Sequence, residues 1–87
     1  MYFVYVLITK SKNQKYISYV GYTKNLEKRL LLHNSSKGAK FTRGRKWILI
    51  YKKKHKSKTE ALKSEYNIKN NRKKRNLIKK RYLLKLK

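Results

Sequence analysis

Cysteine, proline and aspartate are absent from this chain of 87 residues, and glutamate occurs only three times. The lack of cysteine excludes disulfides, thiolate catalysis and zinc sites with cysteine ligands. The three acids, Glu27, Glu60 and Glu65, are too few for a centre in which several carboxylates hold two metal ions. Lysine and arginine number 27, which gives a formal net charge of +24, so a cationic partner is disfavoured.

Long hydrophobic runs are also missing. The longest, Phe3–Ile8, is far shorter than the ~20 residues of a transmembrane helix. Residues Met1–Ile8 lack the basic region and the cleavage site of a signal peptide. We therefore expect a protein that is neither secreted nor membrane-spanning, and that is cytoplasmic or associated with an organelle or nucleoid. Binding of the basic stretch Arg72–Lys87 to a membrane surface is a minor alternative.

The positive charge is unevenly distributed along the chain. Residues 1–35 carry six basic residues and one acid, whereas residues 36–87 carry 21 basic residues and two acids. Coding bias towards AT-rich codons would have supplied acidic residues as well, so it does not explain the excess. A polyanion, with nucleic acid first, is the expected partner. The length predicts one domain over residues 1–87, with a core over 1–78 and a basic C-terminal helix over 72–87.

The hydrophobic pattern predicts a small α/β (α+β) domain. Short runs rich in β-branched and aromatic residues indicate strands, and a first run that is apolar throughout indicates burial on both faces. Thr23 is a candidate N-cap for the first helix, and Ser57 and Glu60 fit a capping box for the second. The predicted strands cover residues 2–8, 16–22 and 46–52, and the predicted helices cover 24–33, 58–70 and 72–86.

Three charged or titratable side chains fall on apolar helix faces. Arg29 lies within the leucine stripe of its helix, with His33 one turn away, and Glu65 lies among the apolar residues of the next helix. Glu27 and Glu60 are explained by helix starts, where an acid favours the helix dipole. Arg29 and Glu65 either pair across the core or line a cleft, in which Glu65 would hold a hard cation and Arg29 would face a phosphate.

The order and spacing of these residues resemble the GIY-YIG nuclease superfamily, in particular its small single-domain branch of uncharacterised proteins. The resemblance covers about residues 1–78 and extends to the nuclease domains of excision-repair and homing endonucleases. It implies a three-stranded antiparallel sheet flanked by helices and metal-dependent hydrolysis of DNA phosphodiesters. The motifs that carry it are Val4-Tyr5-Val6, Tyr19-Val20-Gly21, Arg29, His33, Glu65, SSKGAKFTRGRKW and TEALKSEYNIK.

The resemblance also implies roles for the catalytic residues. Tyr5 and Tyr19 would project into one cleft, with Tyr19 acting on the attacking water as base or positioner. A phenol has an ordinary pKa near 10, so a base role requires that the surroundings lower that value. Arg29 would stabilise charge on the phosphoryl oxygens, and His33 would accept or relay a proton.

Two further positions complete the expected site. Glu65 would hold one divalent metal, Mg²⁺ or Mn²⁺. Gly21 would let the strand end turn and the backbone approach the site. The sequence departs from the family pattern in four places: the first motif reads Phe3-Val4-Tyr5, Tyr16 precedes Tyr19 by three residues, Tyr22 stands where some relatives have lysine, and Lys46-Trp47 replaces a common proline. Tyr19 alone has glycine two residues on and arginine ten residues on, which predicts a hairpin about three residues longer than usual.

The loop before the third strand is predicted to follow the nucleic-acid backbone. Phe41 or Trp47 could stack on an unpaired base, although Trp47 at a strand start favours core packing. We expect a structure-selective DNA endonuclease, because a single domain has no separate module to read bases. The alternative is a non-catalytic nucleic-acid-binding protein that keeps the fold. RNA and a protein partner remain open. The predicted phosphate contacts are Lys37, Lys40, Arg43, Arg45 and Lys46.

Overall fold

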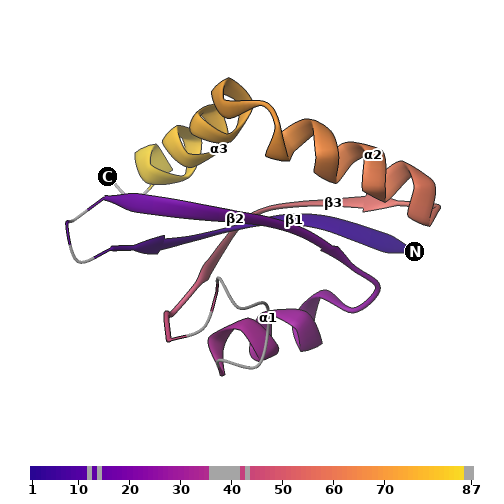
Figure 1. The fold of residues 1–87 in the computed structure, drawn as a ribbon, viewed down its shortest axis with the longest axis horizontal. Helices are drawn as coiled ribbons and strands as arrows, with labels where there is room; N and C mark the ends of the chain where they lie inside the picture. The colour runs from indigo at the N-terminus through magenta and orange to yellow at the C-terminus, as the bar shows by residue number, and fades with distance from the viewer. Residues whose placement is uncertain (12, 14, 36–41, 43, 86–87) are drawn as a thin grey trace.

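The computed structural model of the chain describes residues 1–11, 13, 15–35, 42 and 44–85. Within these residues the elements follow the order β1, β2, α1, β3, α2, α3 (Figure 1). The strands form one antiparallel sheet in the spatial order β2-β1-β3, so the predicted α+β class with a three-stranded sheet is confirmed. The bounds are β1 Tyr2–Lys10, β2 Tyr16–Thr23, α1 Leu26–Asn34, β3 Ile48–His55, α2 Lys58–Lys69 and α3 Arg72–Lys85.

The sheet separates two helical layers, with α1 on one face and α2 and α3 on the other (Figure 1). On the α2 face, Val4 and Val6 of the central strand pack with Ala61 and Ile68. On the α1 face, Tyr5 and Leu7 pack with Trp47, Leu26 and Leu30. Because neighbouring side chains of a strand point to opposite faces, β1 contributes to both cores. This explains why β1 is apolar at nearly every position, as predicted.

The strand register places both motif tyrosines on the α1 face. Tyr5 of β1 lies opposite Gly21 of β2, and Leu7 lies opposite Tyr19. Positions two apart on one strand share a face, so Tyr19 lies diagonally across from Tyr5. Tyr16, by contrast, pairs with Lys10 at the far end of the hairpin.

Hydrogen bonds at the helix starts correct one boundary and confirm another. Helix α1 begins after Asn25, whose side chain accepts a bond from the Lys28 amide at 3.1 Å, so the prediction of Thr23 as N-cap is wrong. The Thr23 hydroxyl instead accepts from the Asn25 amide at 3.2 Å, one step before the helix. Helix α2 begins after Ser57, whose hydroxyl accepts from the Glu60 amide at 3.2 Å, as the capping pattern predicted.

None of the helices among the described residues combines the length and the apolar character that crossing a membrane would require.

Candidate active site

Four predicted catalytic side chains meet on the α1 face of the sheet. Tyr5 comes from β1, Tyr19 from β2, and Arg29 and His33 from successive turns of α1. The ring centres of Tyr5 and Tyr19 are 6.4 Å apart, and that of His33 lies 5.8 Å from Tyr5 and 5.0 Å from Tyr19. The guanidinium of Arg29 lies within hydrogen-bonding reach of both phenols. Two strands and one helix therefore bring these groups together. We call these four residues the tyrosine cluster.

A buried chain of hydrogen bonds runs through the tyrosine cluster. The Tyr5 hydroxyl is 2.9 Å from His33 Nε2, and His33 Nδ1 is 2.8 Å from the Thr42 hydroxyl. Tyr5, His33 and Thr42 are each at most 1% exposed, so these bonds are shielded from water. A buried polar group lowers the stability of the folded protein unless it has a hydrogen-bond partner. Thr42 was not among the residues predicted from the sequence.

The pKa of Tyr5 is raised to about 12, chiefly because burial penalises the phenolate. The hydrogen bond from Arg29 acts in the opposite direction but is the smaller effect, and the charges of Tyr19 and Glu65 raise the pKa further. Tyr5 is therefore a protonated phenol at neutral pH. It serves as a hydrogen-bond donor and not as a general base.

The pKa of His33 is lowered from its ordinary 6.5, first by burial and then by the charge of Arg29. The imidazole is therefore neutral at pH 7. Because Tyr5 accepts from Arg29, which can only donate, the phenolic O–H is left to donate to His33 Nε2. The imidazole proton then lies on Nδ1 and is donated to the Thr42 hydroxyl. The electrostatics thus select one tautomer.

Arg29 is only partly buried, and its guanidinium is oriented by the phenols. The hydrogen bond to Tyr5 is the largest of the effects that raise the pKa of Arg29, so the group is charged at all relevant pH values. Its Nε–H is buried and meets no acceptor among the described residues. An unpaired buried donor on a cation is costly.

Gly21 makes room for the Tyr5 ring. A Cβ atom at this position would lie 2.5 Å from the Tyr5 hydroxyl oxygen, 2.7 Å from Tyr5 Cζ and 3.2 Å from Tyr19 Cε2. Separations under 3.0 Å essentially never occur for real Cβ atoms. Gly21 lies within β2, so its contribution is space beneath a phenol, whereas the sequence had suggested a turn at a strand end.

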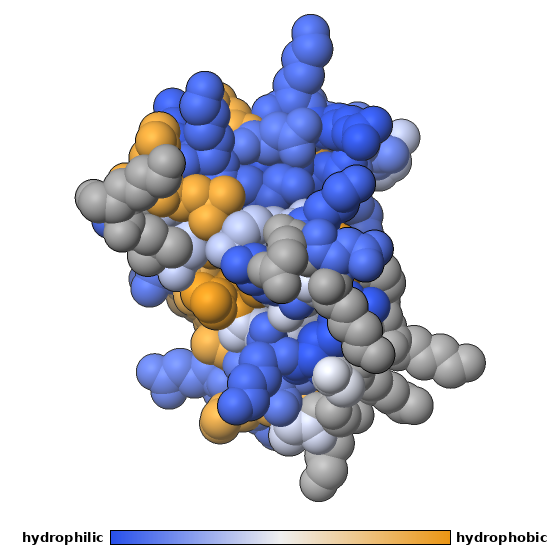
Figure 2. Space-filling view, turned by 90° about the vertical axis from the view of Figure 1, so that its left-hand side faces the viewer, coloured by the Kyte–Doolittle hydropathy of each residue, from blue (hydrophilic) through white to orange (hydrophobic). Residues whose placement is uncertain are grey.

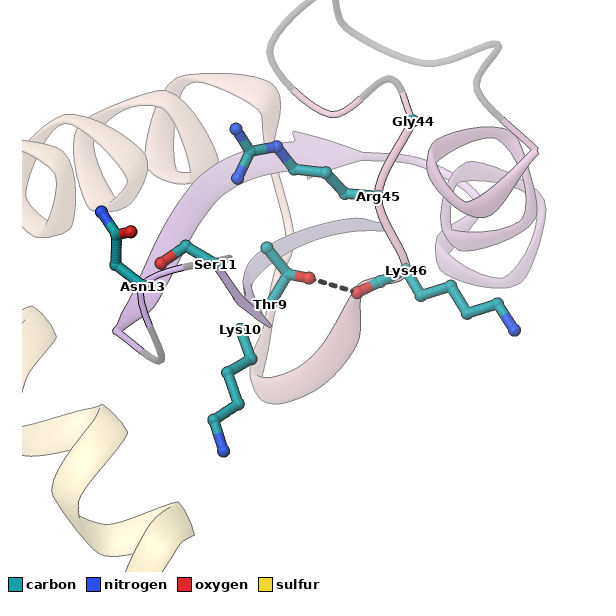
Figure 3. Close-up of a pocket in the computed structure, with 7 residues that line it drawn as sticks. All are labelled: Thr9, Lys10, Ser11, Asn13, Gly44, Arg45 and Lys46. Carbon is teal, nitrogen blue, oxygen red and sulfur yellow. Dashed lines mark hydrogen bonds between the residues drawn. The ribbon is translucent and has the colours of Figure 1, made fainter.

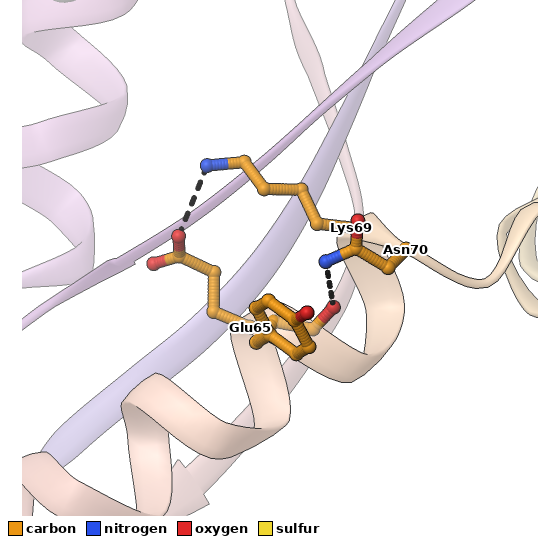
Figure 4. A network of polar contacts seen from close by, with 4 residues as sticks. Glu65, Lys69 and Asn70 are labelled. Atoms are coloured by element: carbon orange, nitrogen blue, oxygen red, sulfur yellow. Dashed lines mark hydrogen bonds and ion pairs between the residues drawn. The ribbon is translucent and has the colours of Figure 1, made fainter.

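Glu65 approaches from the opposite helical layer. It lies on α2, its side chain is 15% exposed, and its Oε1 is 3.1 Å from Lys69 Nζ (Figure 4). Its charge nevertheless contributes to the raised pKa of Tyr5. Glu65 therefore pairs with Lys69 one turn along the same helix, and the alternative of an Arg29–Glu65 pair across the core is wrong. The described residues contain no group of three His, Cys, Asp or Glu side chains suited to a metal.

Of the predicted phosphate contacts before β3, Arg45 and Lys46 lie among the described residues. Both are exposed just before the sheet. Trp47 is 3% exposed, and its ring centre lies 6.3 Å from that of Tyr19. Its Nε1–H donates to the Thr42 carbonyl at 2.9 Å. Stacking of Trp47 on a base is therefore ruled out in favour of core packing. The other predicted contacts, Lys37, Lys40, Arg43 and Phe41, lie outside the described residues.

The comparisons with known proteins place this sheet, with two phenols, an arginine and a histidine on one face, in a family of nuclease-type catalytic domains. The family model of the GIY-YIG catalytic domain matches residues 1–81, and the chain belongs to that family. The UPF0213 protein OB0043 of Oceanobacillus iheyensis is 48% identical over 66 residues, which cover 75% of this chain and 74% of that protein. The UPF0213 protein SH2523 of Staphylococcus haemolyticus is 46% identical over 66 residues, covering 75% and 78% of the two chains.

One solved structure is also similar. The solution structure of the UPF0213 protein BH0048 from Bacillus halodurans is 38% identical and covers 98% of this chain and 85% of that one, with a TM-score of 0.41.

Proposed function

We propose that this protein is a metal-dependent DNA endonuclease that selects DNA structure more than sequence. The observation that carries the proposal is the convergence of Tyr5, Tyr19, Arg29 and His33 on one face of the sheet. Phosphodiester hydrolysis needs a group that positions water and a cation that meets charge on the phosphoryl oxygens. Membership of the GIY-YIG catalytic domain family supports the same reaction class.

The two phenols would have different roles. Tyr5 is buried and donates to His33, so it positions the cluster and holds its proton. Tyr19 is only partly buried and lies between Tyr5 and His33, so it is the phenol that could orient or deprotonate an attacking water. Tyr19 would therefore be required for the rate, and Tyr5 for the geometry.

Arg29 would bind the scissile phosphate. The residue is only partly buried and its guanidinium is charged, so it could donate to a phosphoryl oxygen. The two phenols hold the guanidinium in place before the substrate arrives, so little reorganisation is needed as charge develops.

A divalent metal would be held by Glu65. One carboxylate fits an ion that keeps several waters and takes other ligands from a substrate phosphate, which is the usual arrangement for Mg²⁺. The fit has a condition, because Glu65 already pairs with Lys69 and must release it to bind an ion. When bound, the ion would polarise the phosphate and stabilise the leaving oxygen.

The test is a cleavage screen on branched, nicked, single-stranded and duplex DNA with Mg²⁺ or Mn²⁺. Loss of one preorganised group is expected to reduce the rate by about 10²–10³-fold, so Tyr19→Phe, Arg29→Ala and Glu65→Ala should each be nearly inactive while still binding DNA. The matched controls are Lys28→Ala on α1 and Glu60→Ala on α2, both exposed neighbours. Undiminished cleavage by Glu65→Ala would refute the metal site.

A non-catalytic nucleic-acid-binding protein is the second candidate. The pairing of Glu65 with Lys69 favours it, because that pair occupies the one carboxylate proposed to hold the metal. It predicts binding that falls steeply with salt and no cleavage with either metal. The same screen therefore separates the two candidates.

A further inference from the structure

An open cavity lies at the turn end of the β1–β2 hairpin, away from the tyrosine cluster. Its volume is about 620 Å³, and the hairpin forms one wall while the segment before β3 forms the other. Three of its lining residues are cations, and none is an acid. The lining residues are Thr9, Lys10, Ser11, Asn13, Gly44, Arg45 and Lys46.

One hydrogen bond joins the two walls, and another closes the hairpin turn. The Thr9 hydroxyl donates to the Lys46 carbonyl at 2.6 Å, and the Ser11 amide donates to the Lys15 carbonyl at 2.8 Å within the hairpin turn. The Arg45 side chain extends over the cavity toward Ser11 and Asn13, whereas Lys10 and Lys46 project from its sides (Figure 3). The cavity thus places a guanidinium, a hydroxyl and an amide around one space.

This set of groups matches a phosphodiester. Arginine suits phosphate because its planar N–H groups match two phosphate oxygens, and hydroxyl and amide donors make the same contacts to nucleic-acid backbones. A concave surface lined with cations and no acid attracts an anion more strongly than an open one. The face of the molecule at this end carries much hydrophilic surface, interrupted by hydrophobic patches (Figure 2).

From this geometry we infer that the cavity is a phosphate-binding subsite, which holds the DNA backbone at a fixed distance from the cleavage site. The inference rests on the proposed function, because it takes nucleic acid as the substrate. Ser11 and Asn13 are new to the nucleic-acid surface and come from the turn between β1 and β2. The occupant is a backbone phosphate, so the subsite reads no bases.

The strand sets the spacing between the two sites. Thr9 and Tyr5 lie on one face of β1, four residues apart, which is about 13 Å at the rise of a strand. The phosphates of one DNA strand follow one another along the backbone, so the subsite would contact a phosphate a short, fixed number of nucleotides from the scissile bond. The hairpin would thereby fix where the cut falls relative to a bound segment.

The test is equilibrium binding of short duplex DNA in EDTA at several salt concentrations, which does not depend on cleavage. Lys46→Ala and Arg45→Ala should each lower the slope of log K against log salt by about 0.9, the value for one phosphate contact. Ser11→Ala should weaken binding several-fold at an unchanged slope, because it removes a neutral donor. The matched controls are Lys63→Ala and Ser64→Ala on α2, in the opposite layer.

Two outcomes would overturn the inference. One is a change of slope in Lys46→Ala no larger than in Lys63→Ala, and the other is binding of Ser11→Ala equal to that of Ser64→Ala. A titration with inorganic phosphate alone identifies the source of the ligand. If phosphate saturates the cavity at low concentration and DNA does not displace it, the cavity is a site for free anions. That result would also overturn the inference. Cleavage by wild type together with unaltered binding by the cavity variants refutes the subsite alone. Absence of cleavage together with the expected slopes refutes the nuclease function alone.

Discussion

Gly21→Ala places a methyl group where the Tyr5 phenol lies. The added carbon would be 2.5 Å from the phenolic oxygen, and a contact of 3.4 Å is the lower end of the ordinary range. The ring must therefore move by roughly 0.9 Å, or β2 must shift by as much. Tyr5 is 1% exposed and bonded to His33, so neither movement is free.

The effect on stability follows from this overlap. Overpacking of a filled core costs about 1–3 kcal/mol. Replacing glycine by alanine returns about 0.4–1 kcal/mol, because the unfolded chain loses freedom. We expect a net loss of about 1–2 kcal/mol, which is roughly a 1 M fall in the urea midpoint at the m-values of small domains. The effect on cleavage should be larger, since a displacement near 1 Å in a catalytic group can cost about 10²-fold.

The assay is urea unfolding followed by the fluorescence of Trp47, which is buried beside Tyr19, together with cleavage of the best substrate from the screen. A double-mutant cycle with Tyr5→Phe tests the overlap, because removing the hydroxyl removes the nearer of the two Tyr5 contacts under 3.0 Å and leaves that with Cζ at 2.7 Å. The coupling should be about 0.5–3 kcal/mol in favour of the double variant. Gly44→Ala is the control for the cycle, because it strains a positive φ of 73° but meets nothing within 4 Å.

Two results would refute this reasoning. The first is an unchanged urea midpoint in Gly21→Ala, which would mean that the site can relax without cost. The second is strict additivity of the stability losses of Gly21→Ala and Tyr5→Phe. Additivity with Tyr5→Phe is expected only of the control Gly44→Ala, which makes no contact with the Tyr5 ring. Unaltered cleavage by Gly21→Ala would remove Tyr5 from the positioning role.

Two further predictions concern the buried hydrogen-bond chain. The pKa of His33 is lowered in the folded protein from its ordinary value of 6.5, so below that pH the unfolded chain binds more protons than the folded one. The free energy of unfolding should therefore fall as the pH drops from about 7 to 5, by at most ~1.4 kcal/mol per pH unit. Urea titrations of His33→Gln should show a shallower fall, and parallel slopes would exclude His33 as the source. Thr42→Val removes the acceptor of the His33 Nδ1–H and should cost about 1–3 kcal/mol. Exposed Thr59→Val is its control and should stay within about 0.5 kcal/mol of wild type, so equal losses in both would contradict the assigned bond.

The sequence predicts the architecture well because the patterns of its elements are local. The apolar run in β1 and the cap at Ser57 each depend on a few neighbouring residues, and both are present as predicted. The cap of α1 was assigned to Thr23 because Thr23 and Asn25 have equivalent capping chemistry. The choice between them depends on backbone angles that the sequence does not specify.

The interior of the site was harder to predict. Thr42 meets His33 across nine positions of sequence, through a loop with no periodicity, so no pattern points to it. The role of Gly21 depends on the strand register, because only the pairing of Tyr5 with Gly21 puts the ring over that position. The partner of Glu65 was also missed. Lys69 is one turn away on the same helix, which the spacing alone allowed.

The order of the sheet constrains how the chain can fold during synthesis. Strand β1 is made before β2 and β3, yet it lies between them. The hairpin with β2 can form early, but the other edge of β1 stays open until residues 48–55 have been made, and Val4 and Val6 stay uncovered until α2 follows. Over that interval the chain presents an apolar strand with unpaired amide and carbonyl groups, which invites pairing with another chain. Lysines at positions 10, 12 and 15 of the sequence have been made by then, so nascent chains repel one another during the period when association would be most damaging.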